Sequence, residues 1–195
     1  MITSGIPIGE RPKSHEGIMG TNQQPWLPTD AIEFLEKNIN SSHIGFEFGC
    51  GSSTFWFSKI SKKIYSIESD FDWYSNILDL VKSNNIQNIN INCIPCEMKK
   101  IWDIDTEVGG NYIEYSNHIL NYDFLFDYVI VDGVARPLCI KNSIDKIKSG
   151  GYLIIDNAER PAYHKSMLEI PNEWKVLEFI NSVDRTIIYQ KMDIK

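Results

Sequence analysis

Five short apolar runs, separated by stretches with helical periodicity, constrain the fold of this chain more than any other feature. The runs are "IGFEF", "KKIYSIE", "INCIP", "FDYVIVDG" and "YLIIDN", which begin at residues 44, 62, 91, 126 and 152. They read as continuous apolar runs, which is typical of strands buried on both faces of a parallel sheet. Strands that alternate with helices in this way indicate an α/β fold.

The C-terminal end of the chain follows a different pattern. "WKVLEFI" and "RTIIYQK" are joined by the turn "NSVD", with no helix between them. Two strands joined in this way predict an antiparallel hairpin. The expected fold class is therefore α/β, with a Rossmann-like, doubly wound, mostly parallel seven-stranded sheet that ends in an antiparallel hairpin.

The segments between the strands carry the signals of helix ends. The first follows "LPTD", where Thr29 or Asp30 can cap it, and the second can be capped by Ser52 or Ser53. The last is expected to stop at the glycine pair "GG" at 150–151, because glycine commonly ends helices. The expected helices span residues 31–39, 52–60, 72–84, 111–120 and 139–149.

The length of 195 residues suits a single domain with a sizeable core. Glycines and prolines are so frequent in the first 28 residues that no long element is expected there. The predicted organisation is an N-terminal arm or lid at residues 1–29, followed by one domain at residues 30–195.

The charge and cysteine content narrow the class of protein. With 19 basic and 26 acidic residues the net charge is −7, which disfavours nucleic acid and anionic membranes as partners. No window approaches the roughly 18 apolar residues of a membrane span. The four cysteines are spaced too irregularly for a disulfide framework. We expect a cytoplasmic protein with reduced thiols, and the sequence leaves a homodimer open.

The turns after the first two strands predict a nucleoside site. Ligands of open parallel sheets lie beyond the carboxyl ends of the strands. Gly49 and Gly51 follow the first strand, where missing side chains let a ligand approach backbone amides. Glu68 ends the second strand, and a carboxylate about 20 residues beyond such a turn can accept hydrogen bonds from ribose hydroxyls.

The identity of the nucleoside depends on the third position of the glycine pattern. A pyrophosphate fingerprint requires a third small residue, where this chain has Thr54. Glu47, just before the glycines, would repel a pyrophosphate and suits the ammonium group of a methionine tail. The sequence favours S-adenosylmethionine over NAD. An NAD-dependent oxidoreductase and a non-catalytic cofactor-binding or scaffold protein are the alternatives.

"EFGCGSST" followed by "IESD" resembles motif I and the acidic loop of class I S-adenosylmethionine-dependent methyltransferases, over residues 30 to 190. The terminal hairpin is similar to theirs as well. The resemblance implies a methyltransferase with Glu47 and the glycines at the methionine part, Glu68 at the ribose, and Ser69 with Glu97 or Met98 near the adenine. The expected cofactor-binding residues are Glu47, Gly49, Gly51, Ser53, Thr54, Glu68, Ser69, Glu97 and Asp132.

The tips of the fourth and fifth strands carry Asp132, Asp156 and Asn157. They resemble the set that holds a divalent cation in catechol and caffeoyl-CoA O-methyltransferases, which implies a Mg²⁺ site. "VDGVARPLC" and "DNAERPAY" depart from that pattern and lack its lysine. They look closer to small bacterial methyltransferases of glycan and polysaccharide gene clusters, which implies a sugar or other small-molecule hydroxyl as acceptor. Alternatively, Asp132 caps its turn and Asp156 pairs with Arg160.

Catalysis without a metal needs a base. The candidates are Asp132, His164 and, less favoured, His118. Arg136 and Arg160 lie beyond the same strand ends and can bind an anionic group on the acceptor, or else pair with neighbouring acids. Four further expectations concern aromatic residues and a loop: Trp56 in the core, Trp26 and Tyr163 at the pocket rim, Trp73 over the cofactor, and acceptor specificity in residues 99–122.

Overall fold

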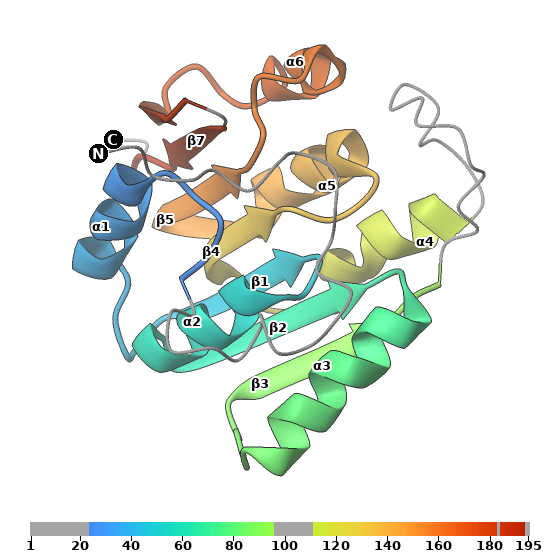
Figure 1. Cartoon of the computed structure of the whole chain (residues 1–195). Helices are drawn as coiled ribbons and strands as arrows, with labels where there is room; N and C mark the ends of the chain where they lie inside the picture. Colours follow the sequence, from blue (N-terminus) through green and yellow to red (C-terminus); the bar gives the residue numbers. More distant parts are fainter. Residues whose placement is uncertain (1–23, 96–110, 183, 194–195) are drawn as a thin grey trace.

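The computed structural model describes residues 24–95, 111–182 and 184–193 (Figure 1). Their strands form one sheet in the order β3-β2-β1-β4-β5-β7-β6. β1 to β5 are parallel, and β7 is antiparallel to both β5 and β6. The predicted fold class is confirmed. The strands are β1 (Ile44–Phe48), β2 (Lys63–Glu68), β3 (Ile89–Cys93), β4 (Phe126–Val131), β5 (Ile147–Ile155), β6 (Lys175–Ile180) and β7 (Arg185–Gln190).

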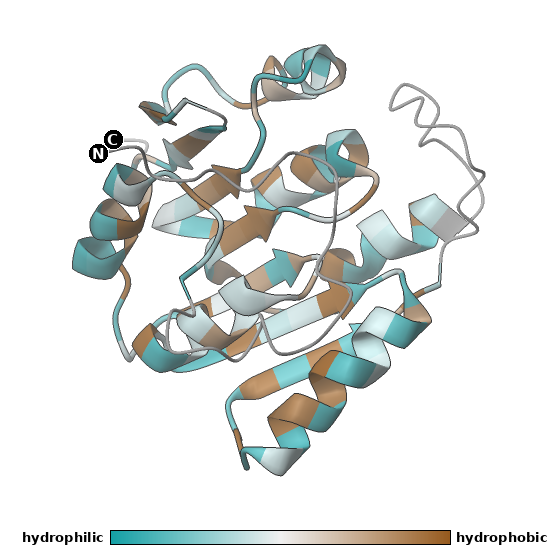
Figure 2. Ribbon diagram, in the orientation of Figure 1, coloured by the Kyte–Doolittle hydropathy of each residue, from teal (hydrophilic) through white to brown (hydrophobic). Residues whose placement is uncertain are grey.

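The described helices cover the two faces of the sheet in two groups. α1, α2 and α3 pack on one face and α4, α5 and α6 on the other. In Figure 2 apolar residues run along β4 and β5 and along the sheet-facing side of α3. The helices are α1 (Thr29–Asn38), α2 (Ser52–Ile60), α3 (Phe71–Ser83), α4 (Asn111–Asn117), α5 (Arg136–Ser143) and α6 (Pro161–Met167), with short 3₁₀ helices at His118–Asn121 and Ile144–Lys146.

Aromatic packing holds both layers to the central strands. On the α1–α3 face the rings of Phe57 and Tyr128 stack at 5.0 Å. The ring of Tyr128 passes over Gly45, where an added Cβ would lie 2.0 Å from a ring carbon. On the other face Phe46 and Phe48 pack in a large aromatic cluster. Trp56 is buried, as expected from the sequence.

Residue parity along the strands places the acidic residues on one face. Ile130 and Ile154 pack in the α1–α3 layer, and side chains two residues apart on a strand share a face. Asp132 and Asp156 therefore emerge on the same side as Glu47, at the carboxyl ends of β4, β5 and β1. The strand order reverses between β1 and β4, which is where ligands of doubly wound sheets bind.

The starts of two helices differ from the expectation. α1 begins at Thr29, so its cap is Pro28, and neither Thr29 nor Asp30 caps it. α2 is capped by Gly51, whose N–H donates to Thr54 Oγ1 at 2.9 Å. Ser52 and Ser53 lie inside its first turn, because the chain turns at the glycine and the following side chains are already helical.

The expected helix over residues 139–149 is wrong in its second half. α5 ends at Ser143, and β5 begins at Ile147, which is fully buried and pairs with β4. Gly150 lies within the strand at φ +80° instead of ending a helix. The turn expected after β5 contains α6, which begins at Pro161, a residue suited to the first helical position.

Within the described ranges, no helix combines the length and apolar character needed to cross a membrane.

Candidate active site

The turn between β1 and α2 has one closed side and one open side. Gly49 has φ +89°, and an added Cβ would lie 2.8 Å from Gly133 Cα, in the backbone that follows β4. Gly51 has an extended φ of −178° and no heavy atom within 4 Å of an added Cβ. Glycine therefore lets two strand ends touch at Gly49. At Gly51 it leaves open space beside the N-terminus of α2.

Glu47 lies under this turn, fully buried. Its carboxylate accepts hydrogen bonds from the hydroxyls of Ser53, Thr54 (2.5 Å) and Ser66 (2.9 Å). Burial raises the pKa of the Glu47 carboxyl to about 7, although the three hydrogen bonds lower it. Sequence reasoning missed Ser66, which the two-residue period of β2 places on the same face as Glu68.

We expect the pKa of Glu47 to give a pH-dependent stability. The carboxyl binds its proton more tightly in the folded state, with a pKa of about 7 against a usual 4.5, so stability should fall as pH rises between these values. A shift of this size corresponds to about 3 kcal/mol. Glu47→Gln cannot ionise and should show a smaller loss, measurable by urea unfolding from pH 4.5 to 8. The raised pKa of Asp156 adds the same pH dependence to the stability of both proteins. If the two plots of unfolding free energy against pH are parallel, Glu47 does not cause the pH dependence.

Glu68 links the first turn to the second. One carboxylate oxygen accepts from the N–H groups of Ser69 (2.6 Å) and Asp70 (3.0 Å), and from the Ser69 hydroxyl (3.2 Å). The other accepts from the Cys50 N–H at 3.2 Å and faces its thiol at 3.7 Å. Trp73 Nε1 donates to the Cys50 carbonyl at 2.6 Å. Hydrogen bonds of Glu68 thus join the turn after β1 to the turn after β2.

At the tips of β4 and β5 the side chain of Arg136 is buried among oxygen atoms. Nε donates to the carbonyl of Gly133, and Nη2 donates to the carbonyl and carboxylate of Asp132, all within 2.9 Å. Nη1 donates to the carbonyl of Asp156 at 2.7 Å and to Asn157 Oδ1 at 3.3 Å. The Arg136–Asp132 ion pair, an open alternative in the sequence, is present. All five N–H groups bond the protein and leave none for an anionic acceptor.

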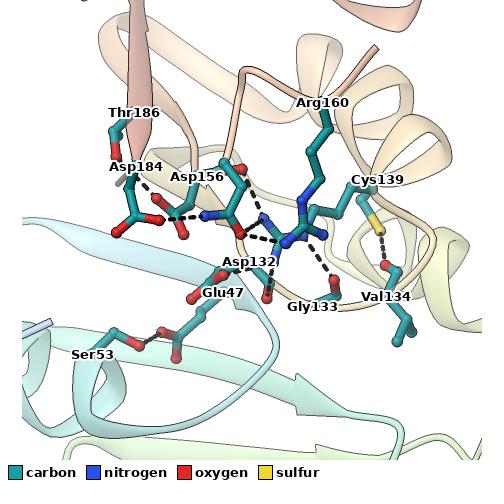
Figure 3. Close-up of polar contacts among 12 residues, drawn as sticks. Glu47, Ser53, Asp132, Gly133, Val134, Cys139, Asp156, Arg160, Asp184 and Thr186 are labelled. Atoms are coloured by element: carbon teal, nitrogen blue, oxygen red, sulfur yellow. Dashed lines mark hydrogen bonds and ion pairs between the residues drawn. The ribbon is translucent and has the colours of Figure 1, made fainter. Parts of the chain in front are cut away.

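The remaining polar side chains at these tips also bond one another. Asp156 accepts from the hydroxyl of Thr186 at 3.0 Å, not from Arg160. Burial, followed by the negative charge of Asp132, raises the pKa of Asp156. Figure 3 shows the carboxylates of Asp132, Asp156 and Asp184 gathered at the strand ends, with Glu47 below them. Thr186 and Asp184, which the sequence did not single out, come from the final hairpin.

Arg160 keeps part of its side chain at the surface. It donates to Asn157 Oδ1 and to the Tyr163 hydroxyl, both at 3.1 Å. Tyr163 is 2% exposed, so the expectation that it lies at the pocket rim is wrong, because its ring packs into the core beneath the two arginines. His164 is exposed on α6.

One other predicted residue lies on the opposite face of the sheet, one is exposed, and two lie outside the described residues. His118 packs against Phe46, on the opposite face of the sheet from Glu47. Trp26 is 61% exposed. Glu97 and Met98 fall outside the described residues, as does the part of the expected specificity loop up to residue 110.

One oxygen atom of each side chain proposed for Mg²⁺ is already engaged, that of Asp156 by Thr186. Asp132 Oδ1 accepts from Arg136, and Asn157 Oδ1 accepts from Arg136 and Arg160. Among the described residues no cluster of three His, Cys, Asp or Glu side chains is arranged to hold a metal. As they lie in the structure, Asp132, Asp156 and Asn157 do not fit a divalent cation.

No protein-family model matches this chain, and no curated protein matches its sequence. Among solved structures, a putative methyltransferase from Streptococcus mutans in complex with S-adenosylhomocysteine aligns with TM-score 0.61 and 16% identity, covering 87% of this chain and 100% of that one. An rRNA methylase from Streptococcus thermophilus aligns with TM-score 0.58 and 15% identity over 83% and 93% of the two chains. This chain has the methyltransferase fold.

A third structure extends the comparison to a protein with a different acceptor. The N-methyltransferase NodS from Bradyrhizobium japonicum, also in complex with S-adenosylhomocysteine, aligns with TM-score 0.51 and 14% identity over 82% of each chain. The methyltransferase fold is therefore shared by proteins whose names give different acceptors. The acceptor of this chain has to be argued from its own residues.

Proposed function

We propose that this chain is an S-adenosylmethionine-dependent methyltransferase that acts on a hydroxyl of a small molecule or sugar. The observation that carries the proposal is the open turn at Gly51, which lies between the buried carboxylates of Glu47 and Glu68 on a methyltransferase fold. Two carboxylates on either side of an unobstructed helix N-terminus suit a ligand with an ammonium group at one end and a ribose at the other.

The residues that would hold the cofactor have defined tasks. Glu47 would face the ammonium group, whose charge would lower the pKa of the buried carboxyl. Glu68 has about four lone-pair sites and five donors near them. Ribose hydroxyls would therefore replace the two side-chain contacts, from the Ser69 hydroxyl and the Cys50 thiol. When bound, S-adenosylmethionine supplies an electrophilic methyl group.

The residues at the strand tips would handle the acceptor. The side chain of Asp132 is 39% exposed, and Arg136 holds one of its oxygens. It would take the proton of an acceptor hydroxyl, with His164 as the other candidate. A positioned base contributes about 10²- to 10⁴-fold to a rate, whereas holding the reactants in line supplies roughly 7 to 11 kcal/mol. Holding the acceptor and the methyl group in line should therefore contribute more to the rate than the base does.

The charge of the chain argues for a small acceptor. Two solved neighbours are named as rRNA methylases or putative rRNA methylases, but this chain has net charge −7 and acidic residues at the strand tips. Phosphate backbones are bound by lysine and arginine, and here Arg136 is saturated by protein oxygens. A nucleic-acid acceptor is therefore disfavoured.

Binding of S-adenosylhomocysteine tests the proposal. At a concentration near 100 times its Kd, a ligand stabilises the folded state by about 2.7 kcal/mol, which raises Tm by roughly 5 to 10 °C for a chain of this size. NADH should leave Tm unchanged, because Thr54 fills the third glycine position and packs against Glu47. A rise in Tm with NADH alone would favour the oxidoreductase. No rise in Tm with either S-adenosylhomocysteine or NADH would reject both the methyltransferase and the oxidoreductase. Binding without turnover on any acceptor would favour a scaffold.

A further inference from the structure

The guanidinium of Arg136 is enclosed by five oxygen atoms from two loops. Three come from the loop after β4 (the Asp132 carbonyl, the Asp132 carboxylate and the Gly133 carbonyl) and two from the loop after β5 (the Asp156 carbonyl and Asn157 Oδ1). Carboxylate, amide and carbonyl oxygens are also the ligands of hard divalent cations. The loops thus present the donor set of a cation site, and a protein side chain provides the cation.

Each loop contains one residue in the left-handed backbone region, and at Ala135 this conformation is strained. Ala135 has φ +51° and Asn157 has φ +49°. For a residue such as alanine, the left-handed region is costly. Strained backbone persists where the surrounding contacts over-determine it. Here the contacts that bridge the two loops are those of Arg136, which directly follows Ala135 and bonds Asn157.

We propose that Arg136 takes the place of a divalent cation between the tips of β4 and β5, so that this chain binds no metal there. Arg136 then acts as a positioning residue, holding the carboxylate of Asp132 toward the acceptor. The role of Arg136 in positioning Asp132 rests on the proposed methyltransferase function. The proposal that no metal ion binds there does not. Because its five N–H groups are used, Arg136 gives no direct contact to the acceptor.

The first experiment titrates the purified wild-type chain with Mn²⁺, which takes the same oxygen ligands as Mg²⁺ and can be followed by electron paramagnetic resonance. We expect no stoichiometric binding below 1 mM Mn²⁺ (roughly the concentration of free cellular divalent ions). One tightly bound Mn²⁺ that is lost in Asn157→Ala would overturn the proposal. One bound Mn²⁺ that persists in Asn157→Ala but is lost in Asp156→Asn would also overturn it, whereas one that persists in both variants would lie elsewhere and would leave the Arg136 oxygens metal-free, as proposed.

The second experiment exchanges the cation. Arg136→Ala removes five hydrogen bonds and the counter-ion of Asp132, and leaves Asn157 Oδ1 with Arg160 alone, which should lower Tm by about 10 °C. Addition of 1 mM Mn²⁺ should recover part of this loss and give a bound Mn²⁺ signal, whereas Arg136→Lys, which keeps a positive charge, should show neither effect. A metal ion would not replace an arginine that is purely structural. A folded Arg136→Ala variant that binds no Mn²⁺ and whose Tm does not change when Mn²⁺ is added would therefore contradict the proposal. If Arg136→Ala does not fold, the wild-type titration decides.

These outcomes are independent of the cofactor proposal. The Mn²⁺ titrations need neither S-adenosylmethionine nor an acceptor, and S-adenosylhomocysteine binding is measured separately on the wild-type chain. A chain that binds S-adenosylhomocysteine and also a metal at Asn157 would retain the proposed function and lose this inference. A chain that binds neither would retain the inference on the cation and lose the proposed function.

Discussion

Gly49→Ala is expected to lose much of the stability of the fold. At φ +89° an L-residue is strained, and the new Cβ would lie 2.8 Å from the Cα and 2.9 Å from the nitrogen of Gly133. The left-handed conformation costs about 1 to 2 kcal/mol and overpacking adds roughly 1 to 3. The obstacle is backbone joined directly to β4, so it cannot rotate away. The two terms together give a loss of about 2 to 5 kcal/mol, a large part of a typical total of about 5 to 15 kcal/mol, and urea unfolding measures this loss.

Gly150→Ala is the matched control for this loss. Gly150 has φ +80°, close to that of Gly49, but nothing lies within 4 Å of an added Cβ. This variant should therefore lose only the conformational term of about 1 to 2 kcal/mol. The difference between the two variants isolates the contact between the turns after β1 and β4. Equal losses would show that this contact contributes nothing.

The sheet could be predicted from the sequence because its signals are local. Each central strand is a short apolar run followed by a turn, and the final hairpin has no helix between its strands. The same reasoning placed Asp132 and Asp156 at neighbouring strand ends, since parallel strands end at one edge. Local signals failed where a long-range contact decides: β5 begins at Ile147 because this residue pairs with Phe126 of β4 in the sheet, not because of any residue beside it.

The partners at the candidate site could not be read from the sequence for the same reason. Arg136 and Arg160 were equally suited to an acceptor anion or to a salt bridge. The structure separates them through contacts 20 residues apart, such as that of Arg136 with the Asp156 carbonyl. Thr186 reaches Asp156 across 30 residues of sequence. No local pattern encodes these distances, so sequence reasoning found the acids, left the Arg136–Asp132 pair as one of two alternatives and missed Thr186.

Gly51→Ala should weaken binding of the cofactor without lowering stability, whereas Gly49→Ala should lower stability. Its φ of −178° suits any residue, and an added Cβ meets nothing within 4 Å, so unfolding by urea should match the wild type. If the methionine end of the cofactor lies against this turn, the new methyl group enters its space. A steric penalty of about 1 to 3 kcal/mol corresponds to roughly 5- to 150-fold weaker binding of S-adenosylhomocysteine, which calorimetry measures.

Gly150→Ala again provides the control, because it changes the same residue type far along the chain from the turn. It should bind S-adenosylhomocysteine like the wild type in spite of its lower stability. Together the two variants test whether affinity follows the open space at Gly51 or the stability of the whole fold. Wild-type affinity in Gly51→Ala would mean that the ligand does not approach this turn, and the carboxylates of Glu47 and Glu68 would then need a role other than holding its two ends.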